Sequence, residues 1–376
     1  MYAQLLNSLR LVSDPRRDRR KVYPLDYILF IIFASTMSGC RSWYEIEDYA
    51  EDWEDSIKAI YRSLSGDTTD YDLPAHDTLN RVVSLLDPEH FEKAYRTWLM
   101  SFLPIGDEKH LCLDGKTMRG VKKLDFEHSA HVVSAYNPAE MASIAQVYLD
   151  SKSNEINGIK LLLEQLDLSD TLVSIDAIGT QTEIAEQIKR KGGDYVLCVK
   201  NNQKHSLQEI ESLFAPIFQQ HIERYEHTEL SHGRIETRVY ELIAEPLSLE
   251  DNPILERWAG LKSVLRVSRR REDKKTGKAS EETAYYISSI ADLERLRQAI
   301  RSHWAIENNL HHCLDVYLGQ DASHKRLGNV PQIMDVVLKI NLFILMHLRE
   351  KTGLSIPRLQ KKLSRSTPEQ ITVLSF

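Results

Sequence analysis

Residues 171–200 have the sequence TLVSIDAIGTQTEIAEQIKRKGGDYVLCVK, which decides the fold. Thr171–Asp176 alternates apolar and polar side chains, as a strand does. Thr180–Glu183 has the pattern of a capping box, which predicts a helix start, and the glycine pair 192–193 ends that helix. Asp194–Lys200 is almost continuously apolar, which is typical of a buried parallel strand. The stretch therefore predicts a strand–helix–strand unit of an α/β sheet.

Upstream of this unit, three β-type runs lie at His110–Asp114, Ala130–Tyr136 and Ala142–Leu149, and an amphipathic helix follows them at Glu155–Leu166. The order is strand, strand, strand, helix, strand, helix, strand. Three hairpin-linked strands followed by crossovers predict a mixed sheet with helices on both faces.

Downstream, residues from about 201 to 290 break this rhythm. Strand-like runs lie at Arg234–Ala244, Leu261–Arg269 and Thr283–Ile290. We interpret this region as a β-rich insertion, because the chain becomes helical again from Leu293.

The first hundred residues follow helical spacing. Apolar positions recur every three or four residues in Leu25–Ala34 and Trp43–Ala59, and further helices begin near His76 and Asp87. Residues 104–107, Pro-Ile-Gly-Asp, mark a boundary. We expect an all-helical domain over residues 1–104 and an α/β domain over residues 105–376.

Composition and charge exclude several classes of protein. The chain has 376 residues, of which 42% are hydrophobic, so wholesale disorder is excluded. Its net charge of −7 excludes a uniformly basic protein, although Arg10–Lys21, Lys262–Lys278 and Lys339–Arg365 are locally basic. Each stretch is either solvated surface or a contact with a polyanion.

The cysteine spacing and the apolar runs indicate a cytoplasmic protein. The 4 cysteines form no C-x-x-C pair, which argues against a zinc ribbon and a disulfide scaffold, and a reducing compartment fits. Tyr27–Ala34 is too short to span a bilayer. Ile333–Leu348 contains charged residues, which indicates a buried helix. We expect no membrane partner.

Three acidic residues stand at positions where a site can form. Asp114 and Asp176 each close a predicted strand, and open α/β sheets build sites at such ends. Each aspartate could equally form a turn or cap a helix. Glu307 lies on the late helix, with His303 and His311 four residues before and after it on one face.

Two strand-end aspartates and a late glutamate suit a pair of Mg²⁺ ions, which prefer carboxylate oxygens. Two ions about 3.5–4 Å apart stabilise the attacking and leaving oxygens of an in-line phosphoryl displacement. We therefore expect Asp114, Asp176 and Glu307 to hold two divalent ions, Mg²⁺ or Mn²⁺. The alternative is a zinc site made of His303, Glu307 and His311.

Motifs along the whole chain carry a resemblance to a known family. They include Tyr23-Pro24-Leu25, His76-Asp77-Thr78, Asp114-Gly115-Lys116, Asn154-Glu155-Ile156, Asp176-Ala177 and His303-Trp304 with Ile306-Glu307-Asn308. In this order they resemble the H-repeat-associated proteins, which are insertion-sequence transposases of the ISAs type in the DDE superfamily.

The resemblance implies an RNase H-like catalytic domain with a β insertion, preceded by a helical transposase-associated domain. It places the acidic triad on Asp114, Asp176 and Glu307, and implies metal-dependent cleavage and strand transfer at the ends of the element. The implied partners are DNA, both element ends and target, and further copies of the chain on that DNA. The implied location is the bacterial cytoplasm, at the nucleoid when DNA is bound.

Two residues depart from the family pattern. His312 stands where the family usually has Trp, and Gln320 stands where it usually has Glu. The alternative function is therefore a catalytically decayed transposase relic that acts only as a DNA-binding protein.

Further residues are expected to support the site or to contact DNA. His303 and Asn308 are expected to orient the late helix or the scissile phosphate. The candidates for phosphate contacts, which contribute sequence-independent affinity, are Lys116, Arg119, Lys200, Arg269, Arg270 and Arg271.

Overall fold

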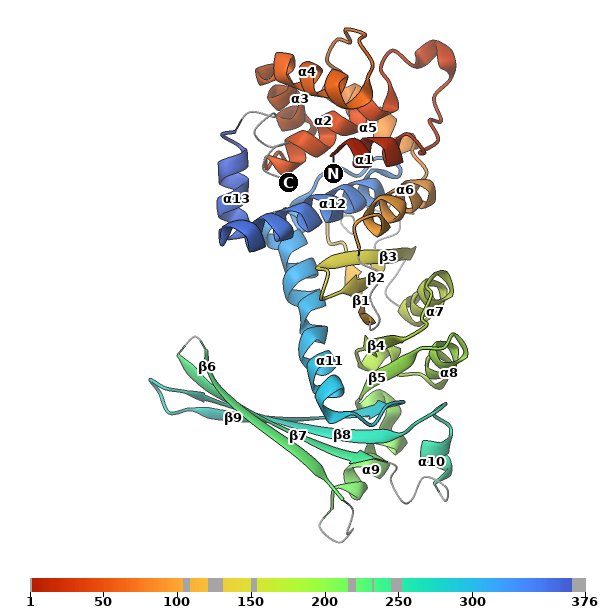
Figure 1. Cartoon of the computed structure of the whole chain (residues 1–376), viewed down its shortest axis with the longest axis vertical. Coiled ribbons are helices and arrows are strands. Elements are labelled where there is room, and N and C mark those ends of the chain that lie inside the picture. Colours follow the sequence, from red (N-terminus) through yellow and green to blue (C-terminus); the bar gives the residue numbers. More distant parts are fainter. Residues whose placement is uncertain are drawn as a thin grey trace.

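The protein is elongated, with helices at one end and a long β-sheet at the other (Figure 1). The computed structural model describes residues 2–103, 109–120, 131–149, 154–215, 221–231, 233–244 and 252–366. The expected domain boundary at residues 104–107 and the first residue of the predicted strand Ala130–Tyr136 lie outside these ranges.

Six helices form the N-terminal part of the helical end. They are α1 (Tyr2–Leu9), α2 (Leu25–Met37), α3 (Trp43–Asp52), α4 (Glu54–Ser65), α5 (His76–Leu85) and α6 (Pro88–Met100). The helical spacing over Trp43–Ala59 belongs to two helices, because Trp53 leaves the helical conformation and its carbonyl starts α4 by accepting from the Ile57 amide.

The C-terminal helices α12 (Val330–Thr352) and α13 (Ile356–Leu363) pack into this same helical core. The helical end is therefore built from both ends of the described chain. By length and composition α12 could cross a membrane, but 83% of its most apolar window is buried inside the protein. The buried ion pair between Asp335 and Lys339 identifies it as a core helix.

A nine-stranded sheet of the order β3-β2-β1-β4-β5-β9-β8-β7-β6 lies beside the helical end, and further helices pack against it. Its first strands are β1 (Lys109–Thr117), β2 (His131–Asn137), β3 (Ala142–Leu149), β4 (Thr171–Ile175) and β5 (Asp194–Val199). β4 pairs in parallel with both β1 and β5, and β2 pairs antiparallel with both β1 and β3. The mixed sheet predicted from the sequence is confirmed.

Helices cover both faces of these strands. Helices α7 (Glu155–Gln165) and α8 (Thr182–Arg190) bury one apolar face against the sheet, and α11 (Leu293–Ala305) covers the other face. The capping box predicted at Thr180–Glu183 is wrong. Thr180 is fully buried and donates to the Cys198 carbonyl at 2.6 Å, so Gln181 starts α8 without a side-chain cap.

The insertion continues the main sheet instead of forming a separate subdomain. It contains α9 (Lys204–Leu213), β6 (Glu223–Ser231), β7 (Arg234–Ala244), α10 (Pro253–Glu256), β8 (Ser263–Asp273) and β9 (Ala279–Ser288). β9 pairs antiparallel with β5, and the tips of β6–β9 project beyond the helices (Figure 1). The strand β6 was absent from the sequence prediction.

After α11 the helix changes its winding. Ile306–His311 and Cys313–Tyr317 are π-helical, with hydrogen bonds that span five residues instead of four. The four-residue spacing of His303, Glu307 and His311 therefore no longer places them on one straight face. Such segments frequently lie at functional sites.

Candidate metal centre and nucleic-acid interface

Three carboxylates gather at the carboxyl ends of the parallel strands. Asp114 is on β1, Asp176 directly follows β4, and Glu155 is the first residue of α7. One ligand oxygen from each lies within 4.8 Å of the others. Among the residues that the structure describes, this is the group that could hold a metal ion, and it contains two of the three acids expected from the sequence.

Glu155 is the member that sequence reasoning missed. It is buried, and its Oε2 lies 2.8 Å from His131 Nε2. A Cβ at position 115 would come within 2.5 Å of the Glu155 side chain, so Gly115 is needed for this close approach. The available signal was Asn154-Glu155-Ile156 among the family motifs, but a glutamate in a first helical turn usually serves the helix dipole.

Glu307 lies outside this tight group of three. It is an exposed residue of the π-helical segment Ile306–His311. Partial desolvation of its carboxylate, and then the charges of Asp114 and Asp176, raise its pKa above the ordinary value, so this carboxylate shares an electrostatic environment with the cluster. Its neighbour Asn308 is also exposed.

The two aspartates have pKa values shifted in opposite directions. Burial and the charge of Asp114 raise the pKa of Asp176, despite a hydrogen bond from the Ile178 amide. Burial would also raise the pKa of Asp114, but His311 outweighs it and the pKa is lowered. His311 Nδ1 lies 3.4 Å from Asp114 Oδ2. Asp114 is therefore the acid that stays ionised most easily.

A buried polar chain fixes α11 against the strands that carry the aspartates. His303 Nδ1 and His110 Nε2 each lie 2.8 Å from the Ser174 hydroxyl, and His110 Nδ1 lies 2.9 Å from the Ser302 hydroxyl. Burial lowers the pKa of His303, and that of His110 to about 3, so both imidazoles are neutral. His303 thus holds the helix, and the described residues do not gather it with Glu307 and His311 into a zinc site.

Lys116 is not at the surface where DNA could reach it, so its expected phosphate contact is corrected. Its side chain is only 7% exposed, lies 2.6 Å from Asp315 and donates to Gln320 Oε1 at 2.6 Å. Gln320 in turn donates to Asp335 at 2.5 Å, and Asp335 pairs with Lys339 at 2.9 Å. This buried chain ties the end of β1 to the segment after Glu307 and to α12.

Two other predicted contacts are accessible. The Arg119 side chain is 82% exposed and lies 3.7 Å from Asp321. Lys200 is exposed at the end of β5, and its charge partly offsets the rise in the pKa values of Asp176 and Glu307, which indicates that it lies near the cluster.

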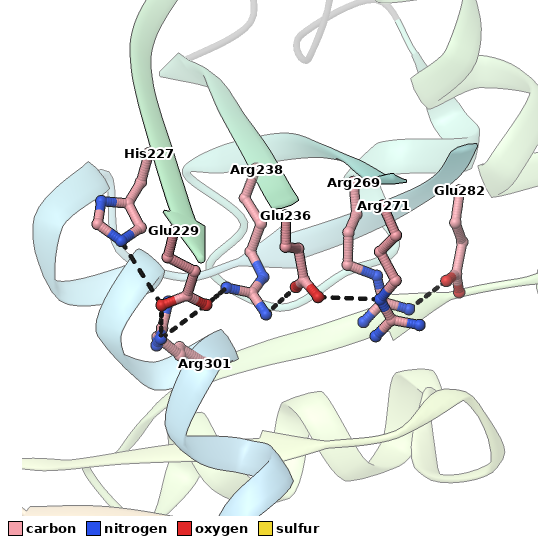
Figure 2. Close-up of polar contacts among 8 residues, drawn as sticks. All are labelled: His227, Glu229, Glu236, Arg238, Arg269, Arg271, Glu282 and Arg301. Carbon is pink, nitrogen blue, oxygen red and sulfur yellow. Dashed lines mark hydrogen bonds and ion pairs between the residues drawn. The ribbon is translucent and has the colours of Figure 1, made fainter. Parts of the chain in front are cut away.

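The three consecutive arginines of the insertion divide between two faces of the sheet. Arg269 and Arg271 point toward α11, where they join a row of charged residues on β6–β9 (Figure 2). Arg270 points the other way, toward Glu272 at 3.5 Å and Glu281 at 3.8 Å. The sequence prediction that all three form one DNA contact is corrected, because side chains alternate along a strand.

Comparisons with known proteins agree with this architecture. Residues 6–99 match a family described as DDE_Tnp_1-associated, and residues 105–342 match the Transposase DDE domain. The chain is 35% identical to "Putative transposase YncI" of Escherichia coli O157:H7, over 96% of this chain and 92% of that protein. It is 33% identical to "H repeat-associated putative transposase YhhI" of Escherichia coli K12, over 91% and 90%.

Both family matches and these relatives cover the helical end and the sheet that carries the acidic cluster. A family match over residues 105–342 takes in Asp114, Asp176 and Glu307 together with the whole β insertion. The chain therefore belongs to the DDE transposase family.

Proposed function

We propose that the chain cleaves DNA at the ends of its own insertion element and joins those ends to target DNA, with divalent metal ions held by Asp114, Asp176 and Glu307. The carrying observation is that carboxylates from β1 and from the end of β4, 62 residues apart in sequence (176 − 114), come within 4.8 Å of each other. The domain division at residues 104/105 and a bacterial cytoplasmic location belong to the same proposal.

The donor set fits Mg²⁺ or Mn²⁺. The cluster offers carboxylate oxygens, which are the ligands that hard divalent cations prefer. Desolvation and then repulsion from Asp114 raise the pKa of Asp176 and of Glu307, and a cation between the carboxylates would relieve the repulsion. Bound ions supply Lewis-acid stabilisation of a phosphoryl transfer.

The chain's own residues prepare this site. His311 keeps the Asp114 carboxylate oriented from the late helix, and the Gly115 amide donates to its other oxygen at 2.8 Å. His131 holds Glu155 beside the two aspartates. Lys200 and Arg119 are exposed cations that we assign to DNA phosphates, and Asn308 is positioned beside Glu307 to contact the scissile strand.

The relic alternative rests on His312 and Gln320, and both side chains have places in the fold. Gln320 accepts from Lys116 and donates to Asp335, which a glutamate at this position could do only while protonated. His312 packs edge-on against Tyr317 at 5.4 Å. These contacts favour an intact site over a decayed one.

A nicking assay tests the proposal. The wild-type chain should nick a supercoiled plasmid that carries the element's ends when Mg²⁺ or Mn²⁺ is present, and should stop when EDTA is added. Asp114→Asn should lose nicking but keep DNA binding. Asp167→Asn, which changes an exposed turn aspartate, is the matched control. Wild-type nicking by Asp114→Asn would overturn the proposal.

A further inference from the structure

A groove of about 480 Å³ lies between α11 and the face of β7, β8 and β9. Its charged and aromatic walls include Arg238, Arg269, Arg271, Arg301 and Trp304. Asn308, which directly follows Glu307 in the sequence, also lines the groove, so the groove reaches the helical segment that carries Glu307. Of the residues that line this groove, the function proposed above uses Asn308 alone.

The arginines of the groove are already paired with glutamates (Figure 2). Arg301 donates to both oxygens of Glu229 at 2.9 and 3.1 Å, and Arg238 donates to Glu229 at 2.7 Å. Glu236 pairs with Arg238 and accepts from Arg271 Nε at 2.9 Å.

The row continues across β8 and β9 in the same way. Arg269 pairs with Glu282, its partner in the strand register. The guanidinium of Arg269 also lies 6.0 Å from the Trp304 ring, which is 48% exposed on the opposite wall. The row therefore contains four arginines and three glutamates.

These pairs leave donors available. Arg271 uses Nε for Glu236, and Arg301 uses one terminal nitrogen for Glu229, whereas a guanidinium has five N–H donors. The glutamates differ in access to solvent, because the Glu236 side chain is 15% exposed and that of Glu282 is 64% exposed. A ligand entering the groove would therefore meet arginines that are oriented but partly neutralised.

We propose that this groove binds the sugar–phosphate backbone of the DNA strand that leads to the catalytic cluster, and that Glu229, Glu236 and Glu282 are built-in competitors for its phosphates. A phosphate, like a carboxylate, offers two oxygens that accept both hydrogen bonds of an arginine fork, so it can replace a glutamate as the partner of an arginine. The proposal rests on the proposed function, since it takes DNA as the substrate.

The competition has a specific consequence. On an ordinary basic surface, the loss of a positive charge weakens DNA binding and there is no paired acid to remove. In this groove, arginines and glutamates should affect DNA binding in opposite directions. Loss of an arginine should weaken DNA binding, and neutralisation of a glutamate should strengthen it. A unit charge about 4 Å from a phosphate changes the affinity about fivefold, even at the dielectric constant of water.

The other face of the same strands provides matched controls. Arg270 and Glu281 are neighbours of Arg271 and Glu282 in sequence, but they face away from the groove and are 57% and 76% exposed. A change there alters the net charge of the chain by the same amount, so it measures the general electrostatic effect alone.

The test is DNA binding by the full chain without metal, measured by fluorescence anisotropy with a labelled duplex that carries an element end. Glu236→Gln and Glu282→Gln should each raise the affinity about fivefold. Arg271→Ala should lower it and should reduce the slope of log affinity against log salt by about 0.9. Arg270→Ala and Glu281→Gln should change the affinity by much less.

Equal shifts in the groove variants and in their opposite-face controls would overturn the inference, as would unchanged affinity in Glu282→Gln. Glu282 is mostly exposed, so its variant keeps the test valid if Glu236→Gln folds poorly, and circular dichroism checks both folds. The proposed function fails separately, through the nicking assay of Asp114→Asn, because that assay does not depend on the groove glutamates.

Discussion

The acidic cluster and the charged row of the β insertion differ in what surrounds their carboxylates. In the cluster, carboxylates face carboxylates, and burial with mutual repulsion raises the pKa values of Asp176 and Glu307. In the row, each carboxylate faces an arginine, and hydrogen bonds from Arg301 and then Arg238 lower the pKa of Glu229 to about 2. Carboxylates are thus repelled by neighbouring carboxylates in the cluster and paired with arginines in the row.

This difference indicates how each region treats a ligand. Gathered carboxylates gain from an added cation, so the cluster could hold one. Paired arginines gain little from an added anion unless it displaces a glutamate, so the row is arranged to exchange partners. The predictions below test this contrast, beginning with the largest expected effect.

Loss of a proposed metal ligand should affect chemistry, whereas loss of a groove arginine should affect binding. Glu307→Gln should lower the maximal rate of metal-dependent nicking about a thousandfold, because transition-state charge loses its stabilisation. Arg271→Ala should leave that rate close to wild type at saturating DNA and raise the DNA concentration needed. A maximal rate that falls equally in both variants would erase the distinction.

Buried and exposed ion pairs should contribute very differently to stability. Lys339→Met leaves the Asp335 carboxylate buried without its cation and should lower the free energy of unfolding by about 3–5 kcal/mol. Arg301→Met breaks a pair whose side chains are 45% and 28% exposed and should cost less than about 1 kcal/mol. Urea unfolding measures both. Similar losses would contradict the assignment of the row as an exchangeable surface.

Glu155 should contribute to metal affinity although the family resemblance assigns it no role. Glu155→Gln should weaken Mn²⁺ binding about tenfold, as changes to groups around a metal site do. Glu183→Gln changes the corresponding first-turn glutamate of α8, which is exposed, and should leave the affinity unchanged. Calorimetric titration distinguishes the two. Equal affinities would show that Glu155 serves packing alone.

The smallest effect should be a pH dependence of opposite sign in the two regions. Glu229 has a lowered pKa, so its pairs stabilise the fold above about pH 4.5 and lose this contribution as the pH falls toward about 2. Glu229→Gln should therefore reduce stability at pH 7, by less than about 1 kcal/mol.

Glu307 has a raised pKa, so without metal its ionisation destabilises the fold as the pH rises through that pKa. Glu307→Gln should slightly increase stability at pH 7 and leave it unchanged near pH 4. Thermal unfolding at several pH values without metal checks both signs. A loss of stability at pH 7 in both variants would contradict the contrast.

The two aspartates could be predicted as site residues from the sequence, because the end of a strand is a local feature of the sequence. Asp114 and Asp176 each follow an apolar run directly, and the topology of an open sheet brings such ends together. Helix and strand positions around them followed from periodicity for the same reason.

Features that depend on distant contacts could not be predicted in this way. The burial of Lys116 depends on Asp315 and Gln320, about 200 residues later in the chain. The joining of the insertion to the main sheet depends on the pairing of β9 with β5. β6 shows no apolar alternation, and its His227 and Glu229 belong to the charged row.

The central claim is that Asp114, Asp176 and Glu307 together bind divalent metal ions, and direct counting of bound Mn²⁺ by electron paramagnetic resonance tests it most directly. The wild-type chain should bind Mn²⁺, and its thermal midpoint should rise as the ions bind. Asp114→Asn, Asp176→Asn and Glu307→Gln should each weaken this binding. Mn²⁺ binding of wild-type affinity and stoichiometry in all three variants would contradict the account.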